Sequence, residues 1–369
     1  MRTVKGLWVQ ARNMPLVQLS AHLDERLHVL GLHDVVDQWV DDEAFSIHLA
    51  LTQEAFERLT PGHDTVELTG RCPNRPVEGP EAISWEVWVA WLCSPIELRF
   101  DSWEDLQSAE RIRHNLCANA SQTSLDFRTE DASRPESHWI YRDDCGYVLL
   151  PDVDLVEALV LATQPERSGS IYAFSCYRAT EYVILLSIAQ EAKVHNPQLY
   201  ERLQQQWRTK AISSKLFHAS FLHEVGEVQA PLPMTWYVPG DRVWFKNPNP
   251  LSSDVTGYEG SWVIYLGGGR FCNFWNHHRP YSLDSKCVEL FHWQHAYRIN
   301  RHGAAHIDED LVTQLTQQSL SNAQERQAIL DRMKRYRDPA GVYGEGGCID
   351  STREIPRKIL PHHCEVILH

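Results

Sequence analysis

One cysteine stands where an extended aromatic segment meets a long apolar segment. In SIYAFSCYRATEYVILLSIAQEAK, residues 170–193, Cys176 precedes an apolar stripe at helical spacing with no Gly or Pro, which predicts a helix. A thiol in the first turn of a helix lies at the positive end of the backbone dipole, beside amides without intrahelical partners. Both factors favour the thiolate, the nucleophilic form, although a cysteine in this position is by itself more often a packed, inert residue.

Two segments downstream of Cys176 have strand character. PGDRVWFKNPN, residues 239–249, predicts a turn followed by an alternating strand. GYEGSWVIYLGGGRFCNFWN, residues 257–276, predicts two strands joined by a glycine turn. A cysteine helix followed by antiparallel strands is the order of papain-like cysteine hydrolases, in which the helix carries the nucleophile and the facing sheet carries the base. We therefore predict an α+β fold with a papain-like core.

Several strings in these segments resemble one known family. They are IYAFSC before an apolar helix, GD-x-V-W-F-K-N-P, the V-I-x-L-G strand with its turn and R-F, and an upstream HWIYRDDCGYVLL. Together they resemble the bacillus-type spore-coat protein-glutamine gamma-glutamyltransferases, which are small calcium-independent transglutaminases. The resemblance spans roughly residues 110–300. It implies a papain-like fold and acyl transfer from protein glutamine to protein lysine.

The resemblance places the nucleophile of the family on Cys176 but changes its partners. The acidic residue next to the nucleophile falls on Ser175, the second acid falls on Ser261, and the histidine falls on Phe274. The groups that assist the thiol must therefore come from other positions if the chemistry is retained.

Neighbouring residues offer replacements for both missing groups. Residues two apart on a strand share a face, so Glu259 points the same way as Ser261 about 7 Å further along and is a candidate acid. A shifted ladder or a bulge after Phe274 would bring His278 or His277 to the thiol as a base. The alternatives are a solvated turn carboxylate for Glu259 and a polar loop ending the strand for the two histidines.

The chemistry follows from what a glutamine carboxamide requires. The thiolate attacks the carbonyl, a protonated partner releases ammonia, and backbone amides near the helix start hold the oxyanion, which gives a thioester. A lysine amine then gives an isopeptide cross-link, whereas water gives deamidation, and exclusion of water decides between them. Aromatic walls serve that purpose, so we predict that Trp244, Trp262 and Trp275 contact the substrate, with core packing as the alternative for each.

Three functional hypotheses follow. The first is a protein-glutamine gamma-glutamyltransferase with a cysteine nucleophile. The second is a protein-glutamine deamidase or amidase, used as an effector or toxin against the proteins of another cell. The third is a noncatalytic binding module in which the fold survives and the triad has decayed, which the changes at Ser175, Ser261 and Phe274 suggest.

Composition limits the classes of partner. The chain has 369 residues, of which 43% are hydrophobic, and a formal charge of −14. Nucleic acids and anionic membranes require a basic surface, so we expect protein substrates bearing glutamine and lysine, with no nucleic-acid or membrane partner. No apolar run approaches the roughly 20 residues of a membrane span, and the first residues lack a signal peptide's hydrophobic region. We expect a cytoplasmic protein with nine reduced cysteines, delivered elsewhere only by a non-classical route.

Three regions are expected along the chain. Residues 1–98 form an N-terminal α+β extension, residues 99–300 the catalytic domain, and residues 301–369 a C-terminal helical extension followed by an irregular tail. In the first region, TVELTG at 65–70 and SWEVWVAWL at 84–92 have strand character. In the last, residues 307–337 predict one helix or two shorter ones. Residues 338–356 are rich in turn formers and are expected to wrap the surface or to be partly mobile.

The sequence predicts no cofactor and no metal. Three glycines after a strand at 267–269 are followed by another strand and no G-K-[ST], so they predict a hairpin turn and not a phosphate loop. His362, His363 and Cys364 are ligand types for zinc. Three adjacent donors cannot by themselves build a tetrahedral site, so we expect no metal there.

Overall fold

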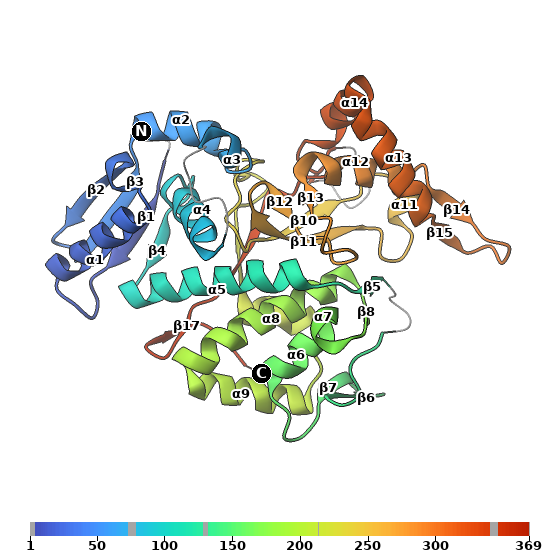
Figure 1. The fold of residues 1–369 in the computed structure, drawn as a ribbon, viewed down its shortest axis with the longest axis horizontal. Helices are drawn as coiled ribbons and strands as arrows, with labels where there is room; N and C mark the ends of the chain where they lie inside the picture. The colour runs from blue at the N-terminus through green and yellow to red at the C-terminus, as the bar shows by residue number, and fades with distance from the viewer. Residues whose placement is uncertain (1–3, 73–78, 128–131, 213, 340–345, 369) are drawn as a thin grey trace.

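The computed structural model describes residues 4–72, 79–127, 132–212, 214–339 and 346–368. A small N-terminal sheet with its helices lies on one side of the molecule, and a larger sheet lies in the middle (Figure 1). A layer of helices lies below this sheet and contains the C-terminus, and the orange helices of residues 283–333 lie beside the far end of the sheet. Within the described residues, no helix combines the length and the apolar character that crossing a membrane demands.

The N-terminal part contains a four-stranded sheet in the order β2-β3-β1-β4. Strands β1 and β2 run antiparallel to β3, and β4 runs parallel to β1. The strands are β1 (Leu7–Gln10), β2 (Val36–Asp41), β3 (Ser46–Leu51) and β4 (Leu98–Phe100). The helical elements are α1 (Leu16–Val29), η1 (His33–Val35), α2 (Gln53–Leu59), η2 (Pro61–His63), α3 (Leu68–Arg71) and α4 (Pro80–Leu92).

The prediction of strands at 65–70 and 84–92 is wrong. The second segment forms most of α4, and the first ends in α3. The alternation of apolar residues in SWEVWVAWL has no meaning here, because α4 is buried on all sides and even Glu86 is only 3% exposed. Pro80 in the first turn, directly after Gly79, is the helix-start signal that the alternation obscured.

Helix α5 (Trp103–Gln122) runs through the centre of the molecule (Figure 1). Ser102 caps its start by accepting a hydrogen bond from the Asp105 amide at 3.1 Å. The helix packs against α4, α8 (Cys176–His195) and β11 (Gly260–Gly267). It therefore joins the N-terminal part to the sheet and to the lower helical layer.

The lower helical layer surrounds α8. Its other helices are α6 (Leu155–Thr163), α7 (Pro165–Ser168), α9 (Pro197–Thr209) and α10 (Ser214–Phe221). Strand β5 (Asp126–Phe127) pairs in parallel with β8 (Ala173–Phe174), which leads into α8. The segment HWIYRDDCGYVLL, which carries part of the family resemblance, forms a hairpin of β6 (Trp139–Arg142) and β7 (Gly146–Leu149).

The large sheet has six antiparallel strands in the order β13-β12-β11-β10-β16-β9. Besides β11, they are β9 (Leu222–Val225), β10 (Arg242–Lys246), β12 (Arg270–Phe271), β13 (Tyr281–Ser282) and β16 (Arg353–Pro356); α11 (Pro250–Ser253) lies between β10 and β11 in the chain. The expectation that residues 338–356 wrap the surface is wrong for β16, which is an interior strand. The preceding Cys348 and Ile349 are fully buried.

The remaining elements follow β13 in the chain. They are α12 (Leu283–Trp293), β14 (Tyr297–Ile299), β15 (Ala305–Ile307), α13 (Glu309–Ser321), α14 (Ala323–Met333), β17 (Ile359–Leu360) and β18 (His363–Cys364). The alternative of two shorter helices between 307 and 337 is confirmed, because Asn322 ends α13 and caps α14. All nine cysteines are free thiols.

The core consists of two apolar clusters. One fills the N-terminal part and includes α4, and the other joins α5, α6, α8 and the large sheet. The predicted α+β class is confirmed, with a cysteine-bearing helix packed on an antiparallel sheet.

Arg353 ties the late strand β16 to the rest of the protein. Its side chain is buried, donates hydrogen bonds to the carbonyls of Asp350, Thr352 and Trp236, and lies 4.1 Å from the Tyr237 ring centre. We predict that Arg353→Met lowers the free energy of unfolding by about 3 kcal/mol, because it leaves buried carbonyls without partners.

Urea denaturation measures this loss. Arg301→Met, at an exposed residue in the turn between β14 and β15, is the matched control and should change the stability little. An equal, small effect of both substitutions would contradict the structural role of Arg353.

Candidate active site

The start of α8 is fixed by local chemistry. Ser175 occupies the N-cap, and its side chain accepts a hydrogen bond from the Arg178 amide at 3.2 Å. Cys176 is the first helical residue, as the sequence predicted, and is partly buried. The residue at the position of the family's first acid therefore stabilises the helix that carries the thiol.

A cavity of about 380 Å³ opens beside Cys176. It brings four of the predicted site residues together, namely Cys176, Glu259, Trp244 and Trp262. The other lining residues are Phe127, Ser175, Tyr177, Gly257 and Gly260. The thiol and a carboxylate thus face one aromatic-walled space.

Two glycines allow aromatic side chains of the cavity wall to lie directly against the backbone. A Cβ at Gly260 would lie 2.3 Å from Trp244 Nε1, and one at Gly257 would lie 2.6 Å from Phe127 Cζ. Strands β10 and β11 place Trp244 opposite Trp262, with the ring centres 5.9 Å apart and nearly parallel. The shape of the cavity therefore depends on the absence of side chains at these two positions.

An arginine that the sequence analysis missed supports the cavity wall. The Arg242 guanidinium lies 4.3 Å from the ring centre of Tyr177 and 4.1 Å from that of Trp262. It pairs with Glu354 of β16 at 2.8 Å, and His218 contacts the other oxygen of Glu354 at 3.0 Å. The alternation in GDRVWF was the available signal, because it places Arg242 on the same strand face as Trp244.

The prediction that the thiol of Cys176 favours the thiolate is wrong in direction. Burial raises the pKa of Cys176, and this effect exceeds the opposing hydrogen bond from the Trp262 backbone and the positive charges of Lys286 and Arg242. The desolvation of the sulfur outweighs the field at the helix start. In the free protein the group is therefore mainly a neutral thiol at pH 7.

The two predicted histidines lie elsewhere, in the loop after β12. His277 Nδ1 lies 2.7 Å from Ser124 Oγ, and its Nε2 lies 3.3 Å from Glu166. The ring of His278 lies beside that of His277, with the ring centres 3.9 Å apart and the planes tilted by 43°. Neither residue lines the cavity of Cys176.

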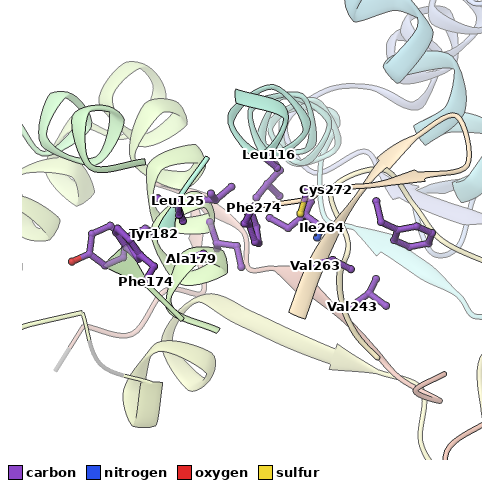
Figure 2. Packing of buried hydrophobic residues seen from close by; sticks show 14 of the residues in the cluster. Leu116, Leu125, Phe174, Ala179, Tyr182, Val243, Val263, Ile264, Cys272 and Phe274 are labelled. Atoms are coloured by element: carbon purple, nitrogen blue, oxygen red, sulfur yellow. Dashed lines mark hydrogen bonds between the residues drawn. The ribbon is translucent and has the colours of Figure 1, made fainter. Parts of the chain in front are cut away.

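Phe274 and Ser261 occupy the family positions of a histidine and an acid, and both are buried. Figure 2 shows Phe274 between α8 and α5, near Ala179, Leu116 and Leu125. Its carbonyl accepts a hydrogen bond from the Leu125 amide at 2.7 Å. Phe274 therefore contributes to the core in this chain.

Trp275, the third predicted substrate contact, lies behind the cavity wall. Its ring centre is 4.8 Å from that of Phe127, which lines the cavity. Phe127 also packs edge-on against Tyr258 at 5.6 Å. Trp275 thus supports the wall from the side of a neighbouring pocket that Glu289 and Glu309 also line.

These features define an α+β protein in which a helix that begins with cysteine packs on an antiparallel sheet. A family model for protein-glutamine gamma-glutamyltransferases matches residues 74–344. The chain therefore belongs to the protein-glutamine gamma-glutamyltransferase family, whose members act on proteins.

The likeness to a solved transglutaminase structure is distant. The solved structure of a transglutaminase from Geobacillus stearothermophilus, without its C-terminal extension, is 18% identical, with a TM-score of 0.39. The match covers 58% of this chain and 97% of the other. No curated protein matches the sequence.

The raised pKa of Cys176 has a measurable consequence for alkylation. Only the thiolate reacts with iodoacetamide, so we predict that the rate at Cys176 still rises with pH above the usual thiol pKa of about 8.5. Peptide mass spectrometry after timed alkylation measures the rate, with a short unstructured cysteine peptide as the control. A rate that levels off below pH 8 would show that the thiolate is already formed and would contradict this prediction.

Proposed function

We propose that this protein is a protein-glutamine gamma-glutamyltransferase whose nucleophile is Cys176. The single observation that carries the proposal is the cavity in which Cys176, Glu259, Trp244 and Trp262 meet. Family membership supports the reaction class, and the cavity supplies the groups that the reaction needs.

Glu259 is the proposed proton acceptor and donor. Because the pKa of Cys176 is raised, the thiol has to lose its proton as it attacks the glutamine carbonyl. The carboxylate of Glu259 takes that proton, and the resulting carboxylic acid returns it to the leaving ammonia. The thioester bond forms as the carbon–nitrogen bond of the carboxamide breaks.

The start of α8 and the backbone of the sheet assist the sulfur. The Trp262 and Tyr177 backbones hydrogen-bond to Cys176 and favour its charged form. The Arg178 amide is bonded to Ser175 Oγ and the Ala179 amide to the Ser175 carbonyl, so the Cys176 amide is the proposed donor to an oxyanion on the carbonyl.

The aromatic walls favour an amine over water in the second step. Trp244 and Trp262 give the cavity an apolar lining, and Trp275 supports Phe127 from behind. A lysine side chain has a long apolar stem that fits such walls, whereas water gains nothing from them. The proposed product is an isopeptide bond between two proteins.

A second candidate is a noncatalytic binding module. The raised pKa of Cys176, the burial of Phe274 and the position of both histidines outside the cavity lining favour it. Deamidation is the third outcome that an assay has to separate.

Incorporation of a biotinylated amine into a glutamine-rich protein tests these alternatives. We predict that Cys176→Ala abolishes incorporation and that Glu259→Gln lowers the rate by about 100-fold, because it removes the proton acceptor. Glu43→Gln, at an exposed residue of the N-terminal part, is the matched control and should keep full activity.

Intact-mass analysis of the same target separates the outcomes. Amine adducts support transfer, a gain of about one dalton without adducts supports deamidation, and no change supports the binding module. Equal incorporation by the Cys176→Ala variant would refute the proposed nucleophile.

The histidines allow a test of the proton donor. We predict that the double variant His277→Asn and His278→Asn keeps most of the activity, because both rings lie outside the cavity lining. The kcat of amine incorporation is the readout, and retained thermal stability shows that the loop is intact. A loss as large as that of Glu259→Gln would assign the proton transfer to an imidazole instead.

A further inference from the structure

A second cluster of ionisable side chains lies far along the chain from Cys176. It joins the start of α5 to the β17–β18 hairpin and contains Asp101, Asp105 and His363. One donor atom of each residue lies within 4.8 Å of the other two. The expectation of no metal at the C-terminal histidines considered only adjacent residues, and the fold adds two carboxylates to them.

Asp105 is the most unusual member of this cluster. The residue is only 1% exposed, and neither of its carboxylate oxygens has a hydrogen-bond partner among the described residues. A buried carboxylate without hydrogen bonds is costly unless a positive charge compensates it. Its oxygens lie 3.5 Å from His362 Nε2 and from His363 Nδ1.

The imidazole of His363 points at the same space. Its Nδ1 is buried and lies 2.5 Å from Asp101 Oδ2, yet it also has no hydrogen-bond partner among the described residues. Two ligands of a tetrahedral zinc ion lie about 3.3–3.5 Å apart, which is the separation of His363 Nδ1 and Asp105 Oδ2.

The surroundings resemble the second layer of a metal site. The other ring nitrogen, His363 Nε2, lies 3.8 Å from Glu365 Oε1, on the side where metal-binding histidines have a carboxylate neighbour. Ser102 lies 3.3 Å from His362 Nε2 and helps to fix the second histidine.

We propose that Asp101, Asp105 and His363 bind a divalent transition-metal ion, with zinc as the best fit. Two carboxylates and one imidazole are ligand types that zinc takes, and a water molecule or His362 completes the tetrahedron. Lys358 contacts Asp101 Oδ2 at 2.5 Å and neutralises one of the carboxylates without a metal. The metal displaces Lys358 from this oxygen and pins the hairpin to α5.

Zinc titration of the full-length protein tests the site. The protein is freed of metal by chelator dialysis and titrated with zinc sulfate in a calorimeter. We expect one equivalent to bind, with affinity at least about 10-fold lower in His363→Gln and Asp105→Asn. Cobalt in place of zinc should give the visible absorption bands of a tetrahedral site, and zinc should raise the melting temperature of the unmodified protein only.

Two further variants keep the test decisive. Asp101→Asn alters a partly exposed ligand and covers the case in which Asp105→Asn does not fold. Glu166→Gln removes one member of the other possible donor group, Glu166, His277 and His278, and should leave zinc binding unchanged. The proposal is overturned if no equivalent binds, if the ligand variants bind as well as the unmodified protein, or if Glu166→Gln alone abolishes binding.

Discussion

The packing of the first turn of α8 against β11 sets the properties of the candidate site. This contact brings the sulfur of Cys176 to the backbone of Trp262 and into a cavity with Glu259. The same burial removes water from the sulfur and raises its pKa. The contact that positions the thiol of Cys176 therefore also lowers its reactivity. The Arg242 guanidinium, which lies between Tyr177 and Trp262, partly offsets this effect because its positive charge stabilises the thiolate.

The residues at the positions of the family's acids and histidine stabilise the fold instead of activating the thiol. Ser175 caps α8, where an oxygen that accepts the Arg178 amide stabilises the helix. Phe274 fills space between α5 and α8, where an imidazole would have had to be desolvated. An acid remains available at Glu259, two residues before Ser261, and the exposed position of Glu259 avoids the cost of burying a carboxylate.

Local periodicity predicted much of this structure from the sequence. The apolar stripe of α8, the alternation of β10 and the glycine turn between β11 and β12 are all signals within one element. Helix α4 escaped prediction because it is buried on every side, so its pattern no longer distinguishes a helix from a strand.

Long-range contacts could not be predicted in this way. The place of β16 between β9 and β10 depends on pairing with two strands more than a hundred residues away. The contact of Asp105 with His363 likewise joins residues that are far apart in the chain. For the candidate site, the sequence indicated Cys176, Glu259, Trp244 and Trp262, but it held no signal for the direction of the thiol pKa, which depends on tertiary burial.

The order of strands in the large sheet also has a consequence for synthesis on the ribosome. Strand β9 meets its neighbours only through β16, so the sheet stays split until residues 353–356 have left the exit tunnel. Glu354, which holds Arg242 against the wall beside Cys176, arrives with the same strand. A nascent chain therefore carries its cysteine helix, complete at His195, without a finished cavity wall until β16 has been made.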